Sequence, residues 1–169
     1  MAVMQQAPHA VYTLGSVRVM VDGSWNPATL RMGCGIIVKD VFGNWVSGLS
    51  MSFGTSTTFV AEILAFEQGL KHCWDLGFKD VVCCTNCSGV QHVLHSMVVA
   101  DSFWAREDIE RVRALLRRDW KLLMVHIPRG SNTATDLLAR QAARDGSSCR
   151  TWHLPPFNLN PLLLQNEVE

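Results

Sequence analysis

The sequence predicts an α/β domain built on a mixed five-stranded sheet, with helices on both faces. Two observations indicate this class. Three apolar segments joined by short turns come first, which is typical of an antiparallel three-stranded meander. Helical periodicity then alternates with short apolar runs, which is typical of parallel strands joined by right-handed crossovers.

The meander is predicted from residues 17–21, 35–38 and a third segment that begins at Trp45. Asp22 and Gly23 end the first strand, and residues 40–44 supply turn-forming side chains before the third.

The crossover half opens with a helix in which Phe59, Ile63, Phe66 and Leu70 recur at helical spacing and which Gly77 closes. The remaining elements are a strand at 81–85, a helix capped by Ser88, a longer helix through 109–116, a strand at 122–127 and a helix from about residue 132.

Length and composition favour one folded domain. Of 169 residues, 48% are hydrophobic and 18% charged, which argues against intrinsic disorder. Fifteen basic and fifteen acidic residues give a net charge of zero, so a globally basic nucleic-acid binder is excluded. We expect a flexible leader over 1–14, the folded domain over 15–146, and an extended tail over 147–169, where prolines interrupt any periodicity.

The hydropathy of the sequence predicts neither a membrane-spanning segment nor a secretory signal. No apolar run approaches the roughly 20 residues of a membrane span. The first residues lack a basic region followed by an apolar stretch, which a secretory signal requires. The expected location is therefore intracellular, nuclear or cytoplasmic. The six cysteines are expected to be free thiols; Cys83, Cys84 and Cys87 superficially resemble a zinc knuckle, but no second Cys/His pair follows.

Three acidic residues lie where the pattern predicts burial or an element end. Asp22 ends the first strand, Glu62 lies within the first helix, and Asp136 lies in the first turn of the last helix. Singly, each is most simply a surface acid or a helix-end charge. Together, they are typical of a site for a hard cation such as Mg²⁺, which takes oxygen ligands.

Sequence motifs around these acids resemble the type 1 ribonuclease H family. They are Val-Met-Val-Asp-Gly-Ser at 19–24, Phe-Val-Ala-Glu-Ile-Leu-Ala at 59–65 and Asn-Thr-Ala-Thr-Asp-Leu-Leu-Ala at 132–139. Residues 43–46 and 70–78 are similar to the plant domains of this type that accompany retrotransposon reverse transcriptases. The motifs occur in the family's order, and the resemblance implies an RNase H-like fold.

The resemblance also implies hydrolysis of the RNA strand of an RNA–DNA hybrid by two Mg²⁺ or Mn²⁺ ions. Asp22 would bridge both ions, Glu62 would hold one and Asp136 the other. His126 matches a family histidine that assists product release or proton transfer, although it is also explained as an ordinary histidine at a strand end. Contacts with nucleic acid are expected at Gly23, Ser24, Trp25, Thr58, Ser88 and Asn132.

The sequence departs from the family at the third acid. The family pattern Thr-Asp-Ser reads Thr85-Asn86-Cys87 here. Asn86 keeps the shape of Asp and one oxygen but loses the negative charge, so it would hold a cation weakly, and cleavage should fall by several orders of magnitude. An introduced inactivating change and a naturally degenerate relative explain Asn86 equally well.

Two other functions fit parts of the sequence. One is an inactive module of the same fold that binds nucleic acid or a protein, with phosphate contacts from arginines of the helix through 109–116. Those arginines are equally explained as a solvated face paired with neighbouring acids. The other is an integrase or 3′–5′ exonuclease on this fold, against which the Asp–Glu–Asp spacing and the motif around Asp136 argue.

Overall fold

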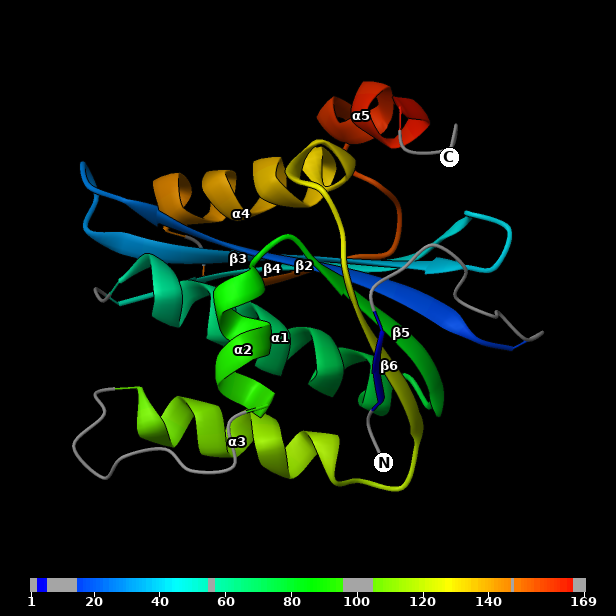
Figure 1. Cartoon of the computed structure of the whole chain (residues 1–169). Coiled ribbons are helices and arrows are strands. Elements are labelled where there is room, and N and C mark those ends of the chain that lie inside the picture. Colours follow the sequence, from blue (N-terminus) through cyan, green and yellow to red (C-terminus); the bar gives the residue numbers. More distant parts are fainter. Residues whose placement is uncertain (1–2, 6–14, 55–56, 96–104, 147, 166–169) are drawn as a thin grey trace.

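A mixed β-sheet lies between two layers of helices in the computed structural model (Figure 1). The structure describes residues 3–5, 15–54, 57–95, 105–146 and 148–165. In these residues no helix is both long and apolar enough to cross a membrane. The described strands are β1 (Val3–Gln5), β2 (Val17–Asn26), β3 (Arg31–Asp40), β4 (Trp45–Phe53), β5 (Asp80–Thr85), β6 (Lys121–His126) and β7 (Cys149–Trp152).

The strand order β1-β6-β5-β2-β3-β4-β7 confirms the predicted class. β2, β3 and β4 form the antiparallel meander, and β5 and β6 run parallel to β2. The described sheet has two strands beyond the five predicted, one at each edge. β1 pairs with β6 and β7 with β4, both through the backbone. Such short edge strands carry no buried alternation to predict them from: β7 is exposed at three of its four residues.

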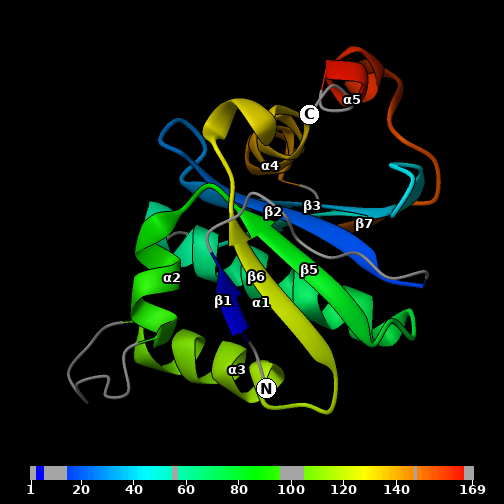
Figure 2. The same cartoon turned by 45° about the vertical axis from the view of Figure 1, so that its right-hand side comes forward.

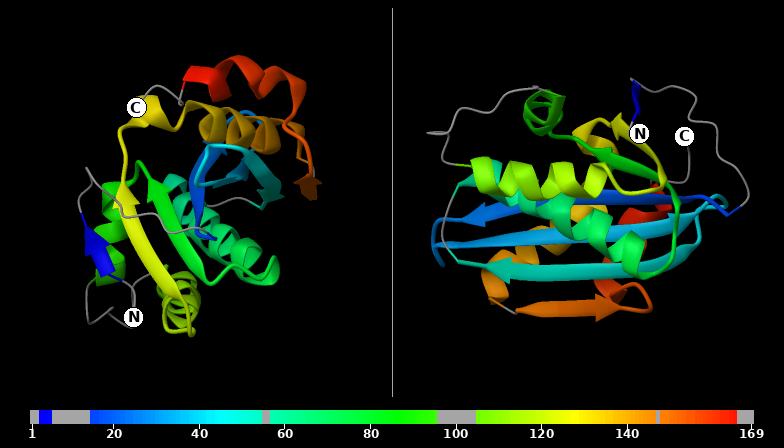
Figure 3. Two further views of the ribbon diagram at one scale, coloured as in Figure 1. Left: turned by 90° about the vertical axis from the view of Figure 1, so that its right-hand side faces the viewer. Right: turned by 90° about the horizontal axis from the view of Figure 1, so that it is seen from below.

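The helices divide between the two faces of the sheet (Figures 2 and 3). α1 (Thr58–Asp75), α2 (Ser88–His95) and α3 (Arg106–Leu116) cover one face, and α4 (Thr133–Asp145) and α5 (Asn160–Gln165) the other. Short 3₁₀ turns, Arg129–Ser131 and Phe157–Leu159, precede α4 and α5.

Alternation along β2 divides the core between the two faces. Val19 and Val21 pack against α1, whereas Met20 packs on the α4 side with Leu138 and Leu159. Leu159 is fully buried, although it belongs to the segment that was expected to be an extended tail. That segment instead forms β7, a 3₁₀ turn and α5. Trp45 fastens it to the sheet, because its Nε1 donates to the Trp152 carbonyl at 3.1 Å.

Two glycines of β3 set the position of α4. A Cβ at Gly33 would lie 2.5 Å from the backbone nitrogen of Ala143, and one at Gly35 would lie 2.8 Å from that of Ala139. Only glycine therefore permits α4 to lie this close to β3. This close approach brings the first turn of α4 beside β2.

The cap of α2 differs from the prediction. The helix begins at Ser88, and Cys87 stands just before it. The backbone N–H groups of Gly89 and Val90 face the Cys87 thiol and lower its pKa against the effect of burial, which favours Cys87 over Ser88 as the capping side chain. The geometry favours Cys87 because it occupies the N-cap position, whereas Ser88 already lies within the first turn.

Candidate active site

The sheet opens where β5 ends. Pairing of β2 with β5 reaches only Met20 and Cys84, so Asp22, two residues further along β2, stands beyond the end of β5. Helices α1 and α4 approach this opening from opposite faces of the sheet (Figure 1). Residues from four elements can therefore meet here without crossing the sheet.

Asp22 is the centre of the acidic cluster. The carboxyl groups of Glu62 from α1 and Asp136 from α4 lie within hydrogen-bonding reach of its own carboxyl group. The backbone N–H of Gly23 lies between two carboxylates, 3.1 Å from Asp22 Oδ1 and 3.2 Å from Glu62 Oε2. Asp22 is 3% exposed and Glu62 8%. The three acids predicted from the sequence are thus brought together.

Burial raises the pKa of both inner acids. It raises the pKa of Asp22 to about 9, and the nearby charges of Glu62 and Asp136 act in the same direction. Burial likewise raises the pKa of Glu62 to about 7, against the hydrogen bonds from Asp22 and the Gly23 N–H, which lower it. Without a cation, the pair therefore holds a proton at neutral pH, and Asp22 donates it to Glu62.

Asp136 has a cationic partner on its own helix. Arg140, one turn further along α4, places a guanidinium nitrogen 2.6 Å from Asp136 Oδ2. The carboxylate is 31% exposed, so it forms the solvent-facing side of the cluster. Its place in the first turn of α4 also favours negative charge.

Asn86 lies against a second amide. Asn132 Nδ2 donates to Asn86 Oδ1 at 2.8 Å and to the carbonyl of Val21 at 3.1 Å. The side-chain oxygen with which Asn86 could hold a cation thus already accepts one hydrogen bond. Asn132 is 1% exposed, so the contact that the structure shows for it lies inside the protein; its expected contact with nucleic acid stays a prediction.

The other predicted residues lie on the same elements as the acids, just after Asn86, or on β6 beside β5. His126 ends β6 beside Thr85 and is exposed. Thr58 is exposed one turn before Glu62, and Ser88 is exposed two residues after Asn86. Gly23 is buried, whereas Ser24 and Trp25 are half-buried on β2.

The acids suit a divalent cation in pairs rather than as a closed cage. Among the described residues, no three His, Cys, Asp or Glu side chains form a metal-binding group by themselves. Asp22 does contact Glu62 on one side and Asp136 on the other. Mg²⁺ typically takes one or two carboxylates and completes its shell with water and phosphate oxygens. Each pair therefore fits such an ion.

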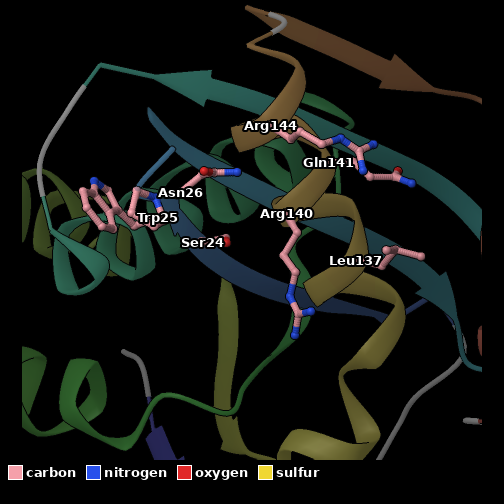
Figure 4. A pocket seen from close by; sticks show the side chains of 8 residues that line it. Ser24, Trp25, Asn26, Leu137, Arg140, Gln141 and Arg144 are labelled. Atoms are coloured by element: carbon pink, nitrogen blue, oxygen red, sulfur yellow. The ribbon is translucent and has the colours of Figure 1, made fainter. Parts of the chain in front are cut away.

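A groove of about 440 Å³ borders the acids, between the end of β2 and the outer surface of α4 (Figure 4). Its lining comprises Ser24, Trp25, Asn26, Pro27, Leu137, Arg140, Gln141 and Arg144. The α4 side chains of this groove were not predicted as site residues. The sequence does contain a signal for Arg140. It follows Asp136 by four residues, which is the spacing of neighbours on a helix surface.

Solved structures show which class this fold defines. It is shared with an RNase H1 of the archaeon Halobacterium salinarum, at 24% identity and a TM-score of 0.69, covering 77% of this chain and 98% of that one. LC11-RNase H1, isolated from compost and solved in complex with an RNA/DNA hybrid, matches at 24% identity and a TM-score of 0.66 over the same shares. The chain therefore has the RNase H-like fold.

The family model described as "Reverse transcriptase-like" matches residues 20–142, and the chain belongs to this family. An Arabidopsis thaliana protein named "Putative ribonuclease H protein" is 24% identical over 155 residues. That match covers 92% of this chain but 25% of the relative, so the chain spans about a quarter of the relative's length.

Proposed function

We propose that the chain is a ribonuclease H-type domain that binds RNA–DNA hybrid and whose site is built to hydrolyse the RNA strand. The observation that carries this proposal is the double contact of Asp22 with Glu62 and with Asp136. A carboxylate shared between two others is what two neighbouring dications require. We infer, on the family's motifs, a kinship with plant retrotransposon domains of this type.

Two Mg²⁺ or Mn²⁺ ions would be held by Asp22 with Glu62 and by Asp22 with Asp136. Bound there, they would activate a water and stabilise the leaving oxygen of the cleaved phosphodiester. The chain's own residues prepare the site. The Gly23 N–H fixes the orientation of Asp22 and Glu62, and Ser24 follows on β2, where it can approach the ribose of the RNA strand. His126 stands exposed at the end of β6, where it can exchange protons with solvent.

Asn86 weakens catalysis in this proposal. Its Oδ1 accepts from Asn132, and its amide brings no negative charge to the ion held with Glu62. The expected cost is several orders of magnitude in cleavage rate. Binding should survive, because most affinity for nucleic acid comes from phosphate contacts and not from the acids.

The test is Asn86→Asp, assayed for Mg²⁺-dependent cleavage of a labelled RNA–DNA hybrid. Asn132 Nδ2 can donate to Asp as it does to Asn, so the variant needs no repacking. Asn158→Asp adds the same charge at an exposed position of the Phe157–Leu159 turn and serves as the control. The proposal is supported if Asn86→Asp gains RNA cleavage and Asn158→Asp does not. If the double variant Asp22→Asn, Asn86→Asp loses this cleavage again, the activity belongs to this site.

A second candidate is a catalytically inactive module that binds nucleic acid through the same fold. The Asn86–Asn132 bond favours it, since an oxygen turned toward a neighbouring amide is not offered to a cation. If Asn86→Asp binds hybrid with the salt dependence of phosphate contacts but cleaves nothing, this candidate replaces the first. If the unaltered chain binds no hybrid at low salt, both lose their support.

A further inference from the structure

The groove beside the acids carries positive charge that the proposed chemistry does not use. Arg140 and Arg144 lie one turn apart on α4 and line the groove opposite Ser24 and Asn26 of β2 (Figure 4). Residues four apart on a helix are separated by about 6 Å along its axis, a spacing suited to neighbouring phosphates of one strand. The planar guanidinium group binds phosphate oxygens in pairs.

Both guanidinium groups are exposed, and each pairs with an acid of α4. Arg140 is 66% exposed and bonds Asp136, whereas Arg144 is 64% exposed and lies 3.0 Å from Asp145 Oδ1. Ion pairs at such exposed positions contribute little to stability, so either arginine can exchange its partner at low cost. The guanidinium groups of Arg140 and Arg144 can therefore bind an anion at the surface of α4.

Arg140 also joins the groove to the acidic cluster. Its partner Asp136 lies within hydrogen-bonding reach of Asp22, so one guanidinium group touches the outer acid and lines the groove. A cation bound at Asp136 and the Arg140 side chain would compete for the same carboxylate oxygen. Arg140 already lines the groove, so its guanidinium group can turn from Asp136 to an anion bound there.

We propose that this groove holds the phosphate backbone of one nucleic-acid strand, and that Arg140 is shared between Asp136 and that backbone. It neutralises Asp136 in the free protein and transfers to a phosphate when the strand enters, which exposes Asp136 to a cation. Arg144 contacts the adjacent phosphate and takes no part in the exchange. The proposal rests on the proposed function, because it assumes that nucleic acid crosses the acids.

The exchange makes nucleic-acid and cation binding cooperative, and it gives Arg140→Gln two opposite effects. Loss of the guanidinium group removes a phosphate contact, so the log–log salt slope of hybrid affinity should fall by about one. The same loss frees Asp136, so the Mg²⁺ concentration at the midpoint of the Mg²⁺-induced rise in melting temperature should fall several-fold. Arg144→Gln should lower the salt slope equally and leave the Mg²⁺ midpoint unchanged.

The experiment measures both quantities on the full chain, with an RNA–DNA hybrid in EDTA for binding and Mg²⁺ alone for melting. Arg117→Gln is the matched control, because it removes the same charge at the exposed C-terminal end of α3, on the opposite face of the sheet (Figure 1). It should change neither quantity.

Three results would overturn this proposal without touching the proposed function. An unchanged Mg²⁺ midpoint in Arg140→Gln would show that Arg140 does not compete for Asp136. An unchanged salt slope in both groove variants, with hybrid binding intact, would place the strand elsewhere and leave the proposed function standing. A lowered slope in Arg117→Gln alone would assign the strand to α3. Absence of hybrid binding by the unaltered chain, in contrast, would refute the proposed function together with the groove.

Discussion

The buried Asp22–Glu62 pair makes the stability of the metal-free protein depend on pH in an unusual direction. The pKa of Asp22 is about 9 in the folded state, against 3.8 when unperturbed. A group whose folded pKa is raised contributes stability that is complete below its unfolded pKa and is lost as pH rises toward the folded pKa. Unfolding between these values releases a proton, so stability falls with rising pH across this window.

The size of the effect follows from one proton shared by the pair. Each pH unit costs about 1.4 kcal/mol per proton released. From about pH 5 to about pH 7, the free energy of unfolding should therefore fall by about 3 kcal/mol through the Asp22 proton alone. Glu62, with a pKa of about 7 against 4.5, acts in the same direction over the lower part of the window.

Urea unfolding in EDTA, followed by tryptophan fluorescence at several pH values, measures this dependence. Asp22→Asn is the comparison, because its amide can still donate to Glu62 but has no proton to release. His72, whose pKa is lowered by burial, contributes the opposite dependence equally in both proteins and cancels in the difference. The difference in free energy should change by about 1.4 kcal/mol per pH unit. Parallel pH profiles for the two proteins would refute the shared proton.

Two further predictions concern the fold. Gly35→Ala should destabilise the protein by more than about 1 kcal/mol and separate α4 from β3, because the new methyl group would overlap the backbone of Thr135 and Ala139. Denaturant unfolding measures this loss of stability. An unchanged unfolding midpoint would contradict the close approach of α4 to β3. Leu159→Ala should lower the free energy of unfolding by about 2–5 kcal/mol, because this side chain is fully buried. Leu154→Ala, at a position 79% exposed, should lower it little. Equal midpoints of the two variants in thermal melts would show that the C-terminal segment is not part of the core.

The sequence was sufficient for the meander, the crossovers and the acids because each leaves a local signal. The apolar alternation of β2 stops near Val21, however, and the prediction stopped with it. The strand continues to Asn26 because its pairing with β3 is made by the backbone and extends past Asp22. Hydrophobic pattern marks where a strand is buried, not where its hydrogen bonds end.

Other features depend on contacts that local sequence does not encode. β7 pairs with β4 about a hundred residues away in sequence, and the burial of Leu159 depends on a surface formed by several strands and α4. The bond between Asn132 and Asn86 joins residues 46 apart and follows from the meeting of β5 and α4. Arg140 lay within reach of sequence reasoning, since its spacing from Asp136 alone predicts the ion pair.

Without a cation, the polar side chains of the site bond to one another or to Arg140. Glu62 shares a proton with Asp22, Asp136 pairs with Arg140, and the oxygen of Asn86 accepts from Asn132. Because unpaired charge in so buried a cluster would be costly, this internal compensation explains how the domain folds before any cation arrives. A cation bound by these acids, as we propose, would therefore have to displace a proton and an arginine rather than fill an open cage. Cation affinity should accordingly rise with pH through the ionisation of the Asp22–Glu62 pair, in parallel with the loss of stability of the metal-free protein.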